Sequence, residues 1–191
     1  MHISFDIDDT LVCDSSVPVE LEEGNYWQRW RYPERLRQGT FALMRALMRR
    51  RCKIWIYTTS NRSVHYLKSW FQSYGIPIAG VINQTVHEQQ LGERGPSKYP
   101  PAFGIDLHVD DSVGVAMEGE AHRFEVLVID PHDLNWAQHI LQEVDARIAA
   151  NPYWEARFMP RPVVVEVEGF FPLGLVRAWR WMTAVAAPTT P

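Results

Sequence analysis

Two carboxylates at the end of the first apolar segment are the residues best placed to do chemistry. Asp6 and Asp8 stand two positions apart in FDIDDTLV and are followed by Thr10. Such a pair can divide its work, one carboxylate acting as nucleophile and metal ligand and the other as general acid and base. A cation must then offset their mutual repulsion. The plainer interpretation is that Asp9 and Thr10 merely cap a turn.

Three more polar groups follow apolar segments further along the chain. Thr58 stands in IWIYTTSNR, where its hydroxyl could bind a phosphate oxygen or simply cap a helix. Asp110 and Asp111 end the segment DLHVDD, and Lys98 lies a short way upstream in GPSKYPP. Carboxylate oxygens from two strand ends are hard ligands of the kind that suit Mg²⁺. Each signal is ordinary by itself, and only their order along the chain is distinctive.

Short apolar segments separated by helix-like stretches must position these residues. Helices are expected at Thr40–Arg50, from Ser63 to about Tyr74 and after Asp133. Mostly apolar rather than alternating segments are typical of parallel strands covered on both faces. Strands are expected at His2–Ile7, Lys53–Thr58, Ala79–Asn83, Ile105–Val109 and Glu125–Ile129. This order predicts an α/β fold, a three-layer Rossmann-like parallel sheet of about five strands with helices on both faces. Such sheets bind ligands beyond the carboxyl ends of their strands.

The ordered set of motifs over about residues 1 to 135 resembles that of haloacid dehalogenase (HAD) superfamily phosphatases. The resemblance implies a HAD-like hydrolase domain over residues 1–150 with a minimal cap. It also implies a Mg²⁺-dependent phosphoric monoester phosphatase that forms an aspartyl phosphate. In that superfamily, a carboxylate two positions after the nucleophile marks phosphate-processing members, so Asp8 argues against dehalogenation. Asp9 stands where many relatives have glycine.

The resemblance implies a role for each matching residue. Asp6 would be the nucleophile, and Asp8 would protonate the leaving oxygen and then activate water. Thr58 and Lys98 would hold and neutralise the transferring phosphoryl group, which suits a reaction that depends on positioning and charge neutralisation. The metal ligands would be Asp6, the main-chain carbonyl of Asp8, Asp110 and, through water or as a support, Asp111. No cofactor beyond Mg²⁺ is expected.

Two other functions use similar residues. A two-component receiver domain also combines an acidic pair, a Thr or Ser and a Lys on a parallel sheet. It needs a phospho-accepting aspartate at a strand end before its threonine, where this chain offers only Asp14 in the loop after the first strand. The receiver is therefore disfavoured. The second alternative is a HAD-fold protein that binds a phosphorylated ligand or a protein partner without turnover, which the intact catalytic set disfavours.

Residues 13–38 are expected to form a small lid that helps to select the substrate. Aromatic residues and arginines interleave there in YWQRWRYPERLR. Trp27 and Arg29 are the predicted substrate contacts, because aromatic rings stack on bases or sugars and arginines bind phosphates. The alternative is that the lid packs its own aromatics and pairs its arginines with nearby glutamates. Thr59 and Arg62, which follow the predicted phosphate-binding threonine, are further candidate contacts.

Composition limits the partners and the compartment. The 19 basic and 23 acidic residues give a net charge of −4, so no global basic field attracts nucleic acid or an anionic membrane. A phosphorylated substrate of unknown identity is the expected partner; nucleic acid is disfavoured as a substrate but not ruled out. Cys13 and Cys52 are too few for a disulfide framework, and the N-terminus lacks the pattern of a signal peptide. A cytoplasmic location is therefore expected.

Residues 151–191 are expected to form an extension punctuated by prolines. Val163–Val167 favours a strand, Leu175 to Val185 carries apolar residues at helical spacing, and residues 186–191 read as a disordered tail. The amphipathic helix would dock on the domain, join two copies into a homodimer or lie on a membrane surface, in that order of preference. Deletion of the residues after Asn151 would change the solution mass if the helix dimerises.

Overall fold

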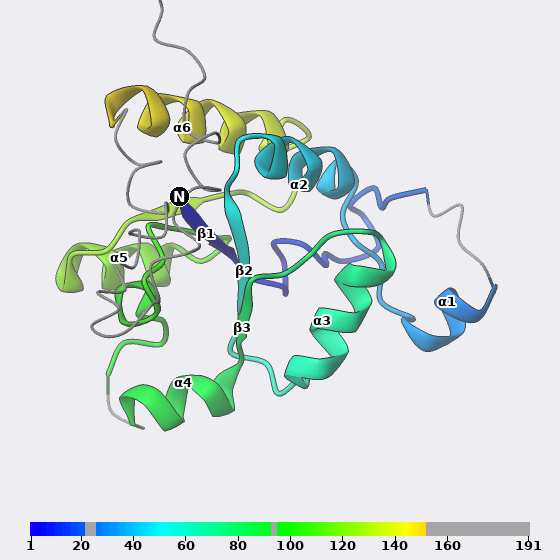
Figure 1. Ribbon diagram of the computed structural model, residues 1–191, viewed down its shortest axis with the longest axis horizontal. Helices are drawn as coiled ribbons and strands as arrows, with labels where there is room; N and C mark the ends of the chain where they lie inside the picture. The colour runs from blue at the N-terminus through cyan, green and yellow to red at the C-terminus, as the bar shows by residue number, and fades with distance from the viewer. Residues whose placement is uncertain (22–25, 93–94, 152–191) are drawn as a thin grey trace, which may run out of the picture. The chain divides into compact units, whose positions relative to one another are not determined.

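A five-stranded parallel sheet with the order β3-β2-β1-β4-β5 organises the protein in a computed structural model that describes residues 1–21, 26–92 and 95–151 (Figure 1). The strands are β1 His2–Phe5, β2 Lys53–Tyr57, β3 Gly80–Ile82, β4 Leu107–Asp110 and β5 Val126–Val128. Each of the five strands expected for the sheet is present, with its ends within two residues of the predicted ones. The predicted fold class, a Rossmann-like parallel α/β sheet, is confirmed.

The register of the sheet brings the carboxyl ends of its central strands together. In β1, Ile3 pairs with Ile54 of β2 on one side and with Leu107 of β4 on the other. The ladder continues one residue past β1, because the Asp6 amide donates to the Val109 carbonyl at 2.9 Å. The residues that follow β1 and end β4 are therefore neighbours.

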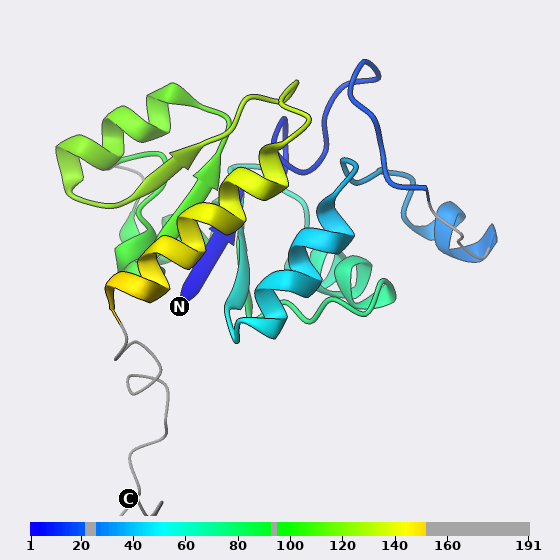
Figure 2. The same cartoon turned by 90° about the horizontal axis from the view of Figure 1, so that it is seen from above.

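Helices cover both faces of the sheet, as predicted (Figures 1 and 2). Alternation along β2 sends Ile54 and Ile56 into a large apolar cluster that includes α2, α3 and α6, whereas Trp55 and Tyr57 belong to a smaller cluster. The helices are α1 Tyr26–Arg31, α2 Thr40–Arg49, α3 Val64–Ser73, α4 Gln84–Leu91, α5 Val113–His122 and α6 Trp136–Ala150, with a 3₁₀ turn at Pro100–Phe103. This cover on both faces explains why the strands are mostly apolar rather than alternating.

The last described helix begins later than the sequence indicates. Asp133 was the expected cap, but α6 begins at Trp136. The Asp133 carboxylate instead accepts a hydrogen bond from the Asn135 amide at 2.8 Å, which forms a turn ahead of the helix. Leu134 consequently lies outside the helix and is exposed.

The segment expected to form a lid is an excursion closed at its base by main-chain hydrogen bonds. The Glu20 amide donates to Leu36 and the Gln38 amide to Pro18, each at 2.8 Å. Helix α1 belongs to this segment, and the Gln28 side chain ties it to α3 through Ser73 at 2.9 Å.

Two further predictions concern the C-terminus and membranes. The strand, helix and tail expected after Asn151 lie outside the described residues. Among the helices that are described, none is long and apolar enough to cross a membrane.

Candidate active site

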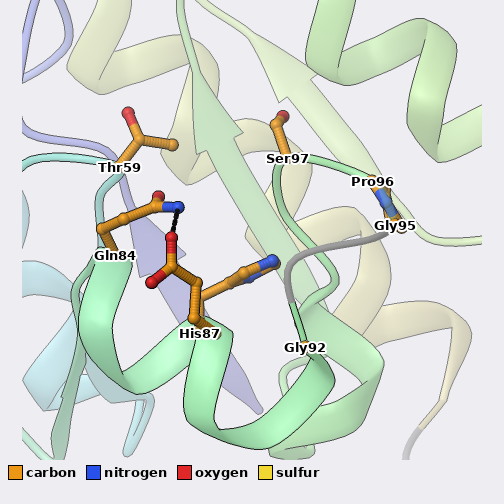
Figure 3. A pocket seen from close by; sticks show the side chains of 8 residues that line it. Thr59, Gln84, His87, Gly92, Gly95, Pro96 and Ser97 are labelled. Carbon is orange, nitrogen blue, oxygen red and sulfur yellow. Dashed lines mark hydrogen bonds between the residues drawn. The ribbon is translucent and has the colours of Figure 1, made fainter.

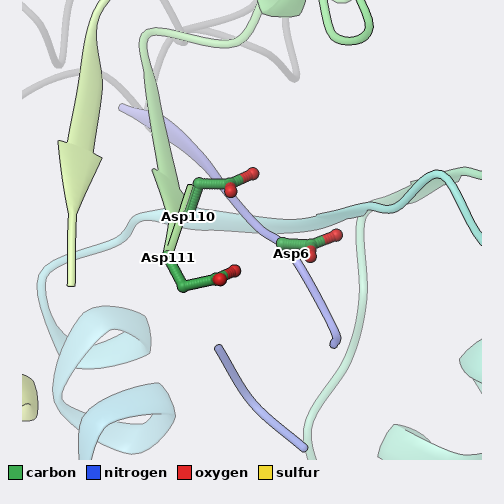
Figure 4. A group of neighbouring side chains, drawn as sticks. All are labelled: Asp6, Asp110 and Asp111. Carbon is green, nitrogen blue, oxygen red and sulfur yellow. The ribbon is translucent and has the colours of Figure 1, made fainter. Parts of the chain in front are cut away.

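Three side chains from two adjacent strands converge at the carboxyl edge of the sheet (Figure 4). Asp6 follows β1, Asp110 ends β4, and Asp111 is the next residue. One ligand atom from each carboxylate lies within 4.8 Å of the others. Local strand pattern places each residue at a strand end, and the β1–β4 pairing then brings the carboxylates together.

Lys98 supplies the positive charge that this group of carboxylates needs. Its ammonium nitrogen lies 2.9 Å from Asp6 Oδ1 and 2.5 Å from Asp110 Oδ2, and the side chain is only 3% exposed. Asp6 Oδ1 is a buried oxygen, and the Lys98 ammonium is the partner that faces it. The structure thus brings the predicted lysine to the predicted carboxylates.

His108, on β4, is a further residue of the site, and it was not among the predicted site residues. Its Nε2 lies 2.9 Å from Asp110 Oδ2, and its Nδ1 lies 2.8 Å from Ser4 Oγ. Burial lowers the pKa of the His108 imidazole, and a neutral ring satisfies both contacts when Nε2 carries the proton. The available signal was spacing, because His108 and Asp110 stand two apart on one strand and therefore share a face.

The two buried carboxyls of the site differ in how readily they ionise. Burial raises the pKa of Asp6 from 3.8 to about 6, although the Lys98 cation opposes this effect. Burial also acts to raise the pKa of Asp110, but the His108 hydrogen bond and the Lys98 charge outweigh it and hold that pKa below 3.8. Asp110 therefore stays ionised at neutral pH, whereas Asp6 takes up a proton in mildly acidic solution.

The raised pKa of Asp6 should be visible in how the free energy of unfolding depends on pH. Between pH 3.8 and about 6 the folded state holds a proton that the unfolded state has lost, so the contribution of Asp6 to stability falls as pH rises through this window. We expect the free energy of unfolding of Asp6→Asn, minus that of the wild type, to increase from pH 4 to 6 and then level off. Urea denaturation in the presence of a chelator measures this difference.

A matched control is available at the surface. Arg50 lowers the pKa of Asp145, so the corresponding difference for Asp145→Asn should not increase over the same window. A flat profile for Asp6→Asn would contradict the raised pKa.

The carboxylate group fits a hard divalent cation. Asp6, Asp110 and Asp111 each offer a carboxylate oxygen, and these three oxygens lie within 4.8 Å of one another. Asp111 accepts a hydrogen bond from Thr10 Oγ1 at 3.3 Å, and burial raises its pKa. A divalent cation bound among these oxygens would exchange some of its hydration water for negatively charged carboxylate ligands. These three residues could therefore hold a metal ion.

Asp8, two residues after Asp6, is held by a different partner. Its carboxylate receives a fork of two hydrogen bonds from Arg62, at 2.8 Å and 2.7 Å. Arg62 also donates from Nε to Glu34 at 2.8 Å. The predicted metal contact of Asp8, through its main-chain carbonyl, stays a prediction. Arg62 is a candidate substrate contact by its place in the sequence, and here its side chain contacts the carboxylates of Asp8 and Glu34.

The turn after this pair has a backbone that usually favours glycine. Asp9 has a φ of 57°, in the left-handed region, where aspartate is one of the better tolerated residues. Its amide donates to the Val12 carbonyl at 2.8 Å. Glycine would adopt this backbone without strain, and aspartate tolerates it.

The two threonines after β2 have different surroundings. Thr58 is buried, and its hydroxyl accepts a hydrogen bond from the Ser60 amide at 3.2 Å. Thr59 is one of the residues that line a polar cavity together with Gln84, His87 and Ser97 (Figure 3). Ser97 precedes Lys98 in the chain, so this cavity is bordered by neighbours of both predicted phosphate-binding residues.

Four side chains of α1 are exposed to solvent: Trp27, Arg29, Trp30 and Arg31. Trp27 is 69% exposed and packs edge-on against Trp30 at 6.2 Å between ring centroids. Arg29 is also exposed. Contact of Trp27 and Arg29 with a substrate stays a prediction. Arg37, by contrast, is buried and donates to main-chain carbonyls of Asp130 and Asp133, which gives it a structural role.

No protein-family model and no curated protein matches the chain. Among solved structures, it is similar to an inactive mutant of the HAD domain of effector protein Lem4 from Legionella pneumophila, at 13% identity and a TM-score of 0.45, over 80% of this chain and 97% of that one. A second similar structure is a HAD-superfamily hydrolase, subfamily IA, variant 1, from Geobacter sulfurreducens. It is 14% identical with a TM-score of 0.49, over 74% of this chain and 98% of that one. A third is a predicted HAD-like family hydrolase from Porphyromonas gingivalis, which is 14% identical with a TM-score of 0.45, over 75% of this chain and 97% of that one. At 13–14% identity, each of these three structures is similar to this chain in fold alone.

Proposed function

We propose that the chain is a HAD-like hydrolase, specifically a Mg²⁺-dependent phosphomonoesterase that works through an aspartyl phosphate on Asp6. One observation carries the proposal: the buried Asp6 carboxylate pairs with the buried ammonium of Lys98 at 2.9 Å and has carboxylate oxygens of Asp110 and Asp111 within 4.8 Å. A nucleophile, a cation for phosphate and a metal-binding set are thus combined at one sheet edge. Mg²⁺ held by Asp6, Asp110 and Asp111 would neutralise charge on the phosphoryl group.

The first half-reaction transfers the phosphoryl group to the protein. Asp6 attacks phosphorus, the bond to the leaving oxygen breaks, and Asp8 gives that oxygen a proton. The ammonium of Lys98 pairs with the phosphoryl oxygens, and the Thr58 hydroxyl donates to one of them. These groups act by positioning and by charge neutralisation, which are the main sources of catalysis in phosphoryl transfer.

The second half-reaction releases phosphate. Asp8, now a carboxylate, takes a proton from water while the water oxygen bonds to phosphorus. The bond between phosphorus and the Asp6 oxygen breaks, and the free carboxylate of Asp6 is restored. Asp8 thus serves as acid and then as base, and the overall reaction consumes one water molecule.

Metal removal is the direct test of the proposal. The wild type should hydrolyse p-nitrophenyl phosphate in Mg²⁺, and a chelator should lower kcat/KM by about 10²-fold or more, because the phosphoryl charge is then neutralised by Lys98 alone. Restoring Mg²⁺ should restore the rate. Ca²⁺ serves as the control cation. It should restore a smaller part of kcat/KM than Mg²⁺ does, because Ca²⁺ favours more ligands at longer distances.

The alternative is a protein that binds a phosphorylated ligand without turnover. Folded wild type that fails to hydrolyse aryl and alkyl phosphates in Mg²⁺ would contradict the proposed activity. An increase in melting temperature with phosphate in that same sample would then favour the binding protein. Cytoplasmic location and a homodimer through the C-terminal extension are further proposals, and fractionation and solution mass test them.

A further inference from the structure

Arg62 is bound on every nitrogen of its guanidinium group by carboxylates of the chain itself. Nη1 and Nη2 donate to the two oxygens of Asp8 at 2.8 Å and 2.7 Å, and Nε donates to Glu34 at 2.8 Å. Two parallel hydrogen bonds to one carboxylate fix its orientation as well as its position. The arrangement therefore determines where the Asp8 carboxylate lies.

Arg62 is itself held from two sides. Its main-chain carbonyl accepts a hydrogen bond at 3.0 Å from Asn83, a buried residue that also caps α4. Glu34 accepts a second hydrogen bond, from the Tyr66 hydroxyl at 3.0 Å. Tyr66 lies against Tyr32 of the segment 13–38, with ring centroids 5.5 Å apart. The guanidinium is thus anchored to both the sheet edge and that segment.

Asp8 depends on this fork for its orientation. Its side chain is 52% exposed, and within the described part of the chain Arg62 is its side-chain partner. An exposed carboxylate without the fork would sample several rotamers. Both Asp8 oxygens accept hydrogen bonds in the fork, which suits the carboxylate form that takes a proton from water rather than the carboxylic acid that gives one.

We propose that Arg62 is a positioning residue for Asp8 in the second half-reaction, and that Glu34 anchors it there. The inference rests on the proposed function, since it assigns the fork to the step in which Asp8 takes a proton from water and phosphate leaves Asp6. Arg62 touches neither phosphorus nor water in this role. It keeps the base oriented while the aspartyl phosphate is hydrolysed.

The kinetic consequence separates this role from binding and from folding. With p-nitrophenyl phosphate the first half-reaction needs little help from an acid, because p-nitrophenolate is a good leaving group. In Arg62→Ala we therefore expect kcat to fall by about 10-fold or more and KM to fall in parallel, while kcat/KM stays within a few-fold of the wild type. A burst of nitrophenolate equal to the enzyme concentration should precede the slow steady state.

Two further variants guard against misfolding of Arg62→Ala. Arg62→Lys keeps the charge but loses the fork, so it should recover only part of kcat. Glu34→Gln should shift kcat in the same direction by a smaller factor. The matched control is Arg50→Ala, which removes a similar surface fork to Asp145, made at 2.6 Å and 2.8 Å, and should leave both kinetic constants unchanged.

Each other outcome overturns the inference. A fall in kcat/KM with a rise in KM would show that Arg62 binds the substrate phosphate. Equal falls in kcat and kcat/KM at constant KM would indicate a loss of folded protein, and unchanged or higher kcat would show that the fork does not assist the base. In these cases an active wild type leaves the proposed function standing, whereas an inactive wild type removes both.

Discussion

Asp6→Asn is expected to lower kcat/KM for an aryl phosphate by roughly 10⁴-fold or more, because the loss of a covalent nucleophile leaves only binding and electrostatic stabilisation. The substitution is nearly isosteric. Burial raises the pKa of the Asp6 carboxyl to about 6, which means that its charge is unfavourable in the folded state. The substitution removes this charge, so the variant should still fold. The measurement is p-nitrophenyl phosphate hydrolysis at saturating Mg²⁺, together with a melting curve.

A neighbouring residue provides the control for this prediction. Asp9→Asn makes the same chemical change in the adjoining turn, where asparagine also tolerates the left-handed backbone at φ 57°. It should retain activity within a few-fold. A phosphate-mimicking beryllium fluoride should raise the melting temperature of the wild type and not that of Asp6→Asn. Substantial hydrolysis by folded Asp6→Asn would exclude Asp6 as the nucleophile.

Lys98→Met should have a large effect on both stability and rate. The lysine is 3% exposed and pairs with Asp6 and Asp110, so its loss leaves two buried carboxylates without their cation. Removing one partner of a buried ion pair costs about 3–5 kcal/mol of stability. Loss of a charge that faces the phosphoryl group should lower kcat/KM by about 10²–10³-fold. Urea denaturation and p-nitrophenyl phosphate hydrolysis measure the two effects.

The stability deficit of Lys98→Met should respond to metal. A divalent cation among the carboxylates would supply the missing charge, so Mg²⁺ should stabilise this variant more than it stabilises the wild type. Lys68→Met makes the same change at an exposed position and should alter stability by less than about 0.5 kcal/mol. A Lys98→Met variant as stable as Lys68→Met would contradict the pairing described for Lys98.

Several elements could be read from the sequence because their signals are local. The strands are short, apolar runs, and α2 and α3 carry apolar residues at helical spacing. The chemistry-bearing residues follow these strands directly, so their place at the carboxyl edge was predictable. Parallel strand order then follows from strand–helix–strand connections.

Other elements lack such signals. Helix α4 lies where no helix is expected from the sequence. Within QTVHEQQL only His87 is buried, so no apolar face marks the helix. Helix α5 contains two glycines, which disfavour a helix in isolation. One of them, Gly119, lies so close to the chain that an added Cβ would meet the Phe124 carbonyl oxygen at 2.7 Å. Tertiary packing therefore overrides local propensity here.

The sequence by itself determined which residues stand at the ends of the strands, because each strand is specified by its own short pattern. The partners of those residues were decided by the tertiary structure. Lys98 meets Asp6, His108 meets Ser4, and Arg62 meets Asp8 across 54 positions of chain. No local rule predicts these contacts, since they depend on how strands pair and how loops return over the sheet edge. Sequence thus identified the candidate chemical groups, and the fold decided which of them act on one another.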